Sequence, residues 1–235
     1  MIEQVSAKVM LGGEAAAFSR GGNRLCFVDP RDSGRCIKVL RPDRSPAIKR
    51  GESGFPKNLK PLSSFDDNRE EAGVYAAIQR SVGEAAFSMI PRLHGWVETE
   101  FGAGLCQDLV RDDDGLIAVT LKQYLWQRGR DAALERVLAE FGAAWSAAGM
   151  PSRKLLSHNL VVQCAGGNPL RLWVIDGLGW PDLLPLASYC RGLARRKARR
   201  RITALEDTIR EQLDKRDTPE DFGYHGWLEE EQRAR

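Results

Sequence analysis

The chain has 235 residues and a formal net charge of +3, with 43% hydrophobic and 29% charged residues, which is ordinary for a globular protein of one large domain or two lobes. Its five cysteines are widely spaced and include no CxxC pair, so neither a disulfide framework nor a cysteine zinc site is indicated, and a cytoplasmic location is expected. The sequence shows neither an apolar signal-peptide core nor an apolar run as long as a membrane span.

The first 110 residues predict a small β-rich lobe. Short alternating stretches at 5–11, 24–28 and 35–40 are separated by glycine-containing turns, which is typical of an antiparallel meander. Residues 42–65 hold four prolines and two glycines, and we expect a mobile surface loop without regular structure there. A helix is expected from Asp66 or Asp67. Two further strands are predicted at 90–98 and 105–110.

The second part of the chain predicts a mainly helical lobe over 111–215 and a charged tail over 216–235. Thr120 is expected to cap a short helix that ends near Trp126. Asp131 is expected to cap a longer helix, whose apolar residues follow the i, i+3, i+4, i+7 rule: Leu134, Val137, Leu138, Phe141 and Trp145. A strand pair at 160–163 and 170–175 and a long helix over 186–213 complete an α+β fold.

The predicted strand pair carries the most informative polar residues. Asn159 directly precedes the first strand, and Asp176 directly follows the second, so a hairpin would bring both residues to the same end. An amide oxygen and a carboxylate are ligands suited to Mg²⁺, which takes few protein ligands and keeps its waters or substrate phosphates. Asn, Asp and Gly also dominate ordinary turns, and this stretch by itself is more typical of two such turns.

Three stretches carry a resemblance to a known family. They read LCFVDP followed by RCIKVL, IPRLHGWVET, and VIDGLGWPDLLPLASYC. Together they resemble the YrbL family, known as PhoP regulatory network proteins, and the order of elements resembles the protein-kinase-like fold. The resemblance covers most of the chain between Arg20 and Cys190, without 42–65 and the C-terminal tail.

In the kinase-like fold, the resemblance implies a nucleotide site between the two lobes. Lys38, in the sequence CIK, takes the place of the strand lysine of V-A-I-K, which contacts nucleotide phosphates. Glu71 takes the place of the helix glutamate that pairs with this lysine, and its neighbour Glu70 would do so if the register shifted by one residue. Gly21 and Gly22 lie where the glycine-rich phosphate loop is expected.

The same resemblance assigns the metal to the hairpin. Asn159 matches the last residue of H-R-D-L-x-x-x-N, and Asp176 matches the metal-binding Asp of D-F-G. ATP and Mg²⁺ are therefore the expected ligands. The catalytic Asp of the pattern is replaced by Lys154, and a charged lysine cannot accept the proton of a substrate. His158 is the alternative proton acceptor in this loop, and no catalytic base is assigned.

Other departures concern activity. The glycine-rich turn reads S-R-G-G-N, D-F-G has become D-G-L-G, and no A-P-E motif follows, so a peptide-substrate platform is not expected.

Three functions stay open at this point. The first is an atypical phosphotransferase that binds ATP and Mg²⁺ and acts on an unidentified protein or small-molecule acceptor. The second is a catalytically inert pseudokinase that serves as a regulatory module in a PhoP-type stress response.

The third function rests on the basic run 191–201, which holds seven cations and no acidic residue. Such a run usually forms a solvated helical face, but it also suits the phosphate backbone of nucleic acids or an anionic membrane surface. No aromatic residue interleaves the run, so stacking on single-stranded bases is not predicted. The sequence does not indicate an oligomeric state.

Overall fold

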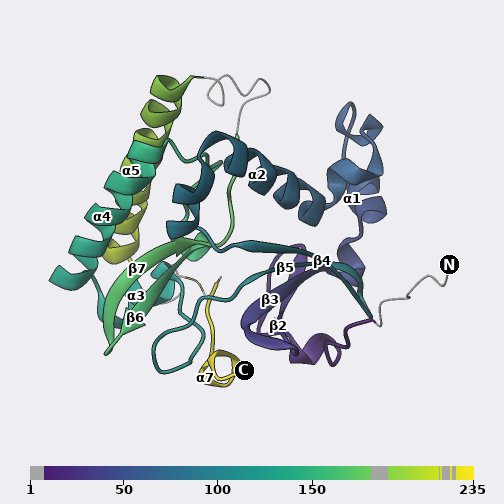
Figure 1. The fold of residues 1–235 in the computed structure, drawn as a ribbon, viewed down its shortest axis with the longest axis horizontal. Helices are drawn as coiled ribbons and strands as arrows, with labels where there is room; N and C mark the ends of the chain where they lie inside the picture. The colour runs from purple at the N-terminus through teal and green to yellow at the C-terminus, as the bar shows by residue number, and fades with distance from the viewer. Residues whose placement is uncertain (1–7, 181–189, 217, 219–222, 224–225) are drawn as a thin grey trace. The chain divides into compact units, whose positions relative to one another are not determined.

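The structure is a computed structural model, and it describes residues 8–180, 190–216, 218, 223 and 226–235. It confirms a mixed α+β fold with a mainly antiparallel sheet and several helices (Figure 1). The chain forms two compact units. Unit 1 comprises Met1–Tyr75 and Arg92–Leu109, and unit 2 comprises Ala76–Pro91 and Val110–Arg235.

Unit 1 is built on a five-stranded sheet in the order β1-β2-β3-β5-β4, with every neighbouring pair antiparallel. The strands are β1 (Ser19–Arg20), β2 (Arg24–Asp29), β3 (Asp32–Leu40), β4 (Leu93–Thr99) and β5 (Gly102–Asp108). Alternate residues of β2 and β3 point into one apolar cluster, which contains Leu25, Phe27, Ile37, Val39 and Cys106. The period-2 pattern of the sequence therefore predicted the central strands correctly.

The expected strand at 5–11 is wrong for the part that the structure describes. Residues 5–7 lie outside the described residues, and within 8–11 only Val9 forms an isolated bridge, with Thr99. The first strand of the sheet is instead the short β1, which pairs Ser19 with Cys26. Val9 and Leu11 are nevertheless buried in the sheet's apolar cluster, so their apolar character reflects packing without a hydrogen-bonded ladder.

The prediction that 42–65 lacks regular structure is also wrong. This stretch contains the helix α1 (Pro46–Glu52) and three 3-10 helices, Pro42–Arg44, Lys57–Leu59 and Leu62–Phe65. Ser45 accepts a hydrogen bond from the Ile48 amide, and Pro46 occupies the first helical position. Proline has no N–H to lose at that position, so it starts a helix there and does not break one.

The helix α2 (Asp67–Ser81) begins where the sequence predicted. The Asp66 carboxylate accepts hydrogen bonds from the amides of Asn68 and Arg69, which satisfies two free donors of the first turn. Lys49 of α1 forms an ion pair of 2.7 Å with Asp67. The boundary between the two units falls within α2, between Tyr75 and Ala76.

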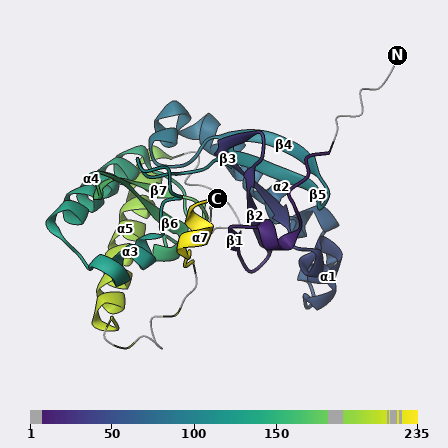
Figure 2. The ribbon, with the colours of Figure 1, turned by 90° about the horizontal axis from the view of Figure 1, so that it is seen from below.

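Unit 2 contains four of the labelled helices and a two-stranded hairpin. The helices are α3 (Leu121–Arg128), α4 (Ala132–Ala148), α5 (Arg191–Asp214) and α7 (Glu230–Arg233), and the hairpin strands are β6 (Leu160–Ala165) and β7 (Asn168–Val174). In Figure 1, α4 runs alongside α5 and beside β7. Figure 2 shows α3 next to β6. Short 3-10 helices lie at Gly83–Ser88 and Ser157–Asn159, and a further one in unit 1 lies at Glu14–Ala16.

The caps predicted for unit 2 are confirmed. Thr120 accepts a hydrogen bond from the Gln123 amide, and Asp131 accepts one from the Leu134 amide at 2.7 Å. Gly149 ends α4 in the left-handed conformation, which glycine adopts without a Cβ penalty. Of the predicted helix 186–213, residues 186–189 lie outside the described residues. No described helix combines the length and the apolar character that crossing a bilayer requires.

The last ten residues, 226–235, pack against the rest of unit 2. Leu228 is buried, and its backbone forms two hydrogen bonds with the side-chain amide of Gln123, at 2.8 and 2.9 Å. Arg233 donates to the carbonyl of Ile117 and forms an ion pair of 2.8 Å with Asp112. The residues before α7 therefore bring the end of the chain against α3 and the loop that precedes it.

Candidate functional site

Lys38 and Glu71 form a buried ion pair in unit 1. The Nζ atom of Lys38, in β3, lies 2.8 Å from Oε1 of Glu71, in α2, and the two side chains are only 6% and 10% exposed. Alternating residues of β3 fix the lysine stem on the face that α2 approaches. The pairing uses Glu71 and not Glu70, which is exposed, so the register predicted from the sequence is the one that the structure has.

Two further side chains hold Glu71 in place. Arg24, at the start of β2, contacts Oε2 of Glu71 through its Nη1 atom. Asn68 lies one helical turn before Glu71, is 1% exposed, and donates from Nδ2 to the backbone carbonyl of Lys38 at 2.9 Å. One carboxylate is thus shared by two cations, and α2 is tied to the backbone of the strand that carries the lysine.

Gly21 and Gly22 form the turn that joins β1 to β2. The Gly21 amide donates to the Arg24 carbonyl at 2.9 Å, so the turn leads directly to the arginine beside Glu71. Arg41 donates from Nη1 to the carbonyls of Gly21 and Gly22 at 3.1 and 3.2 Å. The guanidinium of Arg41 consequently fixes the shape of this glycine turn from the end of β3.

Two cysteines of the sheet, Cys36 and Cys106, are buried. Burial raises the pKa of the Cys36 thiol well above its ordinary value. Burial also raises the pKa of Cys106 to about 11, and the neighbouring Asp29 carboxylate acts in the same direction. Both thiols are therefore neutral at physiological pH and act as small apolar side chains in the sheet.

In unit 2 the hairpin brings Asn159 and Asp176 to one end, as its sequence predicted. Asn159 closes the 3-10 turn before β6, and its carbonyl accepts a hydrogen bond from the Ile175 amide at 2.9 Å. Asp176 follows at the next position, is exposed, and accepts from the Gly177 amide through Oδ1 at 2.7 Å. One antiparallel register, set by Leu160 opposite Val174, thus places the two side chains.

Gly177 allows this close approach. Its φ is +78°, and a Cβ at this position would lie 2.7 Å from the Lys154 carbonyl and 2.8 Å from Nδ2 of Asn159. The Arg153 amide donates to the Gly177 carbonyl at 2.9 Å, and Ser152 bridges Leu178. The segment 152–159 and the segment 176–179 therefore run against each other, with glycine at the point of contact.

The loop residues at the positions expected for proton transfer have separate surroundings. Lys154 is exposed, and the part of it that approaches Gly177 is its backbone carbonyl. His158 is half-buried and packs against the C-terminal segment, because a Cβ at Gly226 would lie 2.9 Å from the Cβ of His158. The structure therefore gives His158 a packing contact within unit 2 and assigns no catalytic base.

The donor set at the hairpin fits a hard cation that keeps most of its water. Asp176 offers an exposed carboxylate and Asn159 offers an amide oxygen, both of which suit Mg²⁺. The space that a Cβ at 177 would fill is what lets the Asn159 amide lie beside the backbone next to Asp176. No cluster of three or more His, Cys, Asp or Glu ligands occurs among the described residues, so a site rich in protein ligands is not formed there.

The basic run lies at the start of α5, and its cations point in different directions. Arg191, Arg195, Arg196, Arg199 and Arg200 are exposed, whereas Lys197 and Arg201 are half-buried. Arg195 donates to the Ala147 carbonyl at the end of α4 at 2.9 Å, so part of its donor capacity is used within unit 2. The run is thus not one uniform solvated face.

Sequence reasoning missed three contributors, of which Arg24 and Asn68 support the lysine pair. Arg24 lies on the same face of β2 as Cys26, which is the cross-strand partner of Lys38, so strand register was the signal that pointed to it. Asn68 lies three residues before Glu71 on one helix, which is a spacing visible in the sequence. The third, Ser152, is buried next to the loop, and its sequence context gives no such signal.

Comparison with known proteins finds similarity over most of the chain. The family model described as PhoP regulatory network protein YrbL matches residues 11–210. A protein of Escherichia coli (strain K12), named "Uncharacterized protein YrbL", is 27% identical over 190 residues, which cover 80% of this chain and 81% of the relative. A Shigella flexneri protein of the same name matches to the same extent. Since the family model spans well over half of the sequence, the chain belongs to the YrbL family of PhoP regulatory network proteins.

Proposed function

We propose that the chain is a kinase-like nucleotide-binding protein that takes ATP together with Mg²⁺. The observation that carries the proposal is the buried Lys38–Glu71 ion pair, held between β3 and α2. A lysine fixed in this way presents its ammonium in a constant position, which is what phosphate binding by the strand lysine of kinase-like proteins requires. Arg24 shares the same carboxylate and adds a second cation to this part of unit 1.

Asn159 and Asp176 would hold the metal in this proposal. Their oxygen atoms are the ligand type that Mg²⁺ takes, and the hairpin of unit 2 brings the two residues to one end. Bound Mg²⁺ supplies positive charge that offsets the charge of the nucleotide phosphates. Lys38 would hold phosphate oxygens, Glu71 would orient Lys38, and the Gly21–Gly22 turn, shaped by Arg41, would lie along the phosphates.

The second candidate is a nucleotide-binding protein without phosphotransfer, which serves as a regulatory module. The observation in its favour is Lys154, an exposed lysine at the position where the resemblance expects a carboxylate base. Phosphoryl transfer depends mainly on positioning and on charge neutralisation, so the loss of a base lowers a rate more than it prevents binding. Binding is therefore the part of the function that the site residues support best.

A thermal-shift titration tests the proposal. At an ATP–Mg²⁺ concentration ten times Kd, we expect the Tm of the wild-type chain to rise by about 4 °C. Asp176→Asn keeps the size of the side chain and removes the ligand charge, so we expect this shift to fall by at least half and to lose its dependence on Mg²⁺. Asp207→Ala removes a carboxylate from the exposed face of α5 and is expected to leave the shift unchanged. An equal shift in wild type and Asp176→Asn would contradict the assigned metal role.

A further inference from the structure

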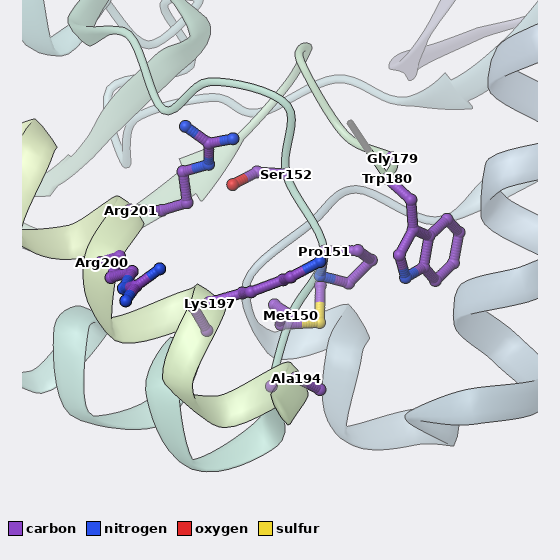
Figure 3. Close-up of a pocket in the computed structure, with 11 residues that line it drawn as sticks. Met150, Pro151, Ser152, Gly179, Trp180, Ala194, Lys197, Arg200 and Arg201 are labelled. Carbon is purple, nitrogen blue, oxygen red and sulfur yellow. The ribbon is translucent and has the colours of Figure 1, made fainter. Parts of the chain in front are cut away.

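The start of α5 and the end of α4 enclose a pocket within unit 2. Its volume is about 290 Å³, close to the lower end of the range for small-molecule sites. The helix α5 contributes Ala194, Lys197, Ala198 and Arg201, which follow the i, i+3, i+4, i+7 spacing and therefore share one face. The short side chains of Ala194 and Ala198 leave space for the pocket, and Lys197 and Arg201 border it. Figure 3 shows Ala194, Lys197 and Arg201 along α5.

The opposite wall comes from the chain that follows α4. Gly149 turns the chain at the end of α4 with φ +67°, and a Cβ there would lie 2.9 Å from the Cβ of Ala194, so the two helices meet closely at this point. Pro151 and Ser152 come next, and the Gly179 amide donates to the Pro151 carbonyl at 3.4 Å. This pairing fixes the position of the wall relative to the segment that contains Asp176.

The buried hydroxyl of Ser152 indicates that the pocket binds a ligand. Its side chain is buried, with 4% of the residue exposed, and its Oγ atom has no hydrogen-bond partner among the described residues. Figure 3 shows the oxygen pointing toward the side of the pocket where Arg200 and Arg201 of α5 lie. A buried hydroxyl without a partner is destabilising, so its orientation toward cationic side chains indicates that a ligand oxygen accepts a hydrogen bond from it.

The charge of the pocket has one sign. Lys197, Arg200 and Arg201 line it, and no acidic side chain is among the described residues that do so. Neither Arg200 nor Arg201 forms a hydrogen bond or an ion pair with another described residue. Guanidinium groups have a fork of N–H donors that matches the oxygens of a phosphate, and a serine hydroxyl can donate one more bond. Trp180 adds an apolar wall beside Met150.

We propose that this pocket, which we name the α5 pocket, binds a phosphate group, either as the free ion or as a phosphate monoester. Arg200 and Arg201 supply the charge, Ser152 donates a hydrogen bond from the opposite wall, and Lys197 adds a third cation. Neither Lys38 nor Asp176 lines this pocket, and the proposal assigns anion binding to part of the basic run 191–201. It is independent of the proposed ATP–Mg²⁺ binding, because it uses neither the metal nor the lysine pair.

The test is a calorimetric titration of the full chain with inorganic phosphate and, separately, with glycerol 2-phosphate, at constant ionic strength and without Mg²⁺. We expect saturable binding that weakens about tenfold in Arg201→Gln and in Arg200→Gln. The matched controls are Arg196→Gln and Arg199→Gln, which remove exposed cations of the same helix that do not line the pocket, and these should bind phosphate like wild type. Tighter binding of one probe than of the other identifies the source of the phosphate group.

Two further variants locate the ligand. Ser152→Ala should weaken phosphate binding several-fold while leaving the unliganded chain as stable as wild type or more so, because it removes a hydroxyl without a partner. Asp176→Asn should leave phosphate affinity unchanged. The proposal is overturned if neither probe binds at millimolar concentration, if the control arginines matter as much as Arg200 and Arg201, or if Asp176→Asn abolishes binding.

Discussion

Replacing Glu71 with alanine is expected to lower the free energy of unfolding by about 3 kcal/mol, because breaking a buried ion pair leaves charge without its partner. Glu71 is the carboxylate that both Lys38 and Arg24 contact, and its side chain is only 10% exposed. The loss is measured by urea denaturation followed by circular dichroism, as a lower midpoint at an unchanged slope.

The matched control for this variant is Glu70→Ala, one position earlier on α2. Glu70 is exposed, so its loss is expected to change stability by about 0.5 kcal/mol or less. The comparison separates the ion pair from general effects of charge and helix propensity on α2. Equal losses in the two variants would contradict the role given to Glu71.

Gly177→Ala is expected to destabilise the chain by about 3 kcal/mol, the sum of a backbone term and a packing term. The backbone term arises because φ is +78°, a conformation that a Cβ disfavours. The packing term arises because the added methyl group would lie 2.7 Å from the Lys154 carbonyl and 2.8 Å from Nδ2 of Asn159. The unfolding midpoint of the purified variant in urea gives the size of the loss.

Gly167→Ala measures the backbone term alone, so its difference from Gly177→Ala gives the packing term. Gly167 has a φ of +73°, close to that of Gly177, but a Cβ there would meet no atom within 4 Å. We expect Gly167→Ala to cost about 1 kcal/mol, from the backbone conformation alone. If Gly177→Ala costs no more than Gly167→Ala, the close contact between 152–159 and 176–179 is not maintained in solution.

Much of the fold follows from local patterns in the sequence. Asp131, the apolar stripe after it and Gly149 predicted α4 because cap, period and stop signal agree. The helix α1 was missed because prolines and glycines around 42–65 suggested a loop, although Ser45 and Pro46 together form an ordinary helix start. Val9 was misassigned because an apolar pattern records burial and does not show whether the backbone pairs.

The residues of the candidate site that belong to sequence motifs could be predicted, because their order along the chain identifies them. Lys38 and Glu71 were located through the resemblance, and the structure places them in contact. The contribution of Arg24 was not predicted, because it depends on the register that sets Cys26 opposite Lys38. Ser152 was not predicted either, since the residues of α5 that line the same pocket come some forty residues later in the chain.

The loop 152–159 contains Lys154 and His158, which stand at the positions expected for proton transfer. The Lys154 carbonyl helps to fix Gly177, and its side chain is exposed. Within unit 2, His158 packs against Gly226. No catalytic base is assigned in this loop, while the oxygens of Asn159 and Asp176 are suited to a cation.

Nucleotide binding at Lys38 is tested most directly by a calorimetric titration of the wild-type chain and of Lys38→Met with ATP in the presence of Mg²⁺. Methionine keeps the length of the lysine stem and removes its charge, so the fold is expected to be retained, which circular dichroism checks. We expect saturable binding to wild type and an affinity at least about tenfold weaker in Lys38→Met. Absence of binding to wild type at millimolar ATP, or equal affinities of the two proteins, would contradict it.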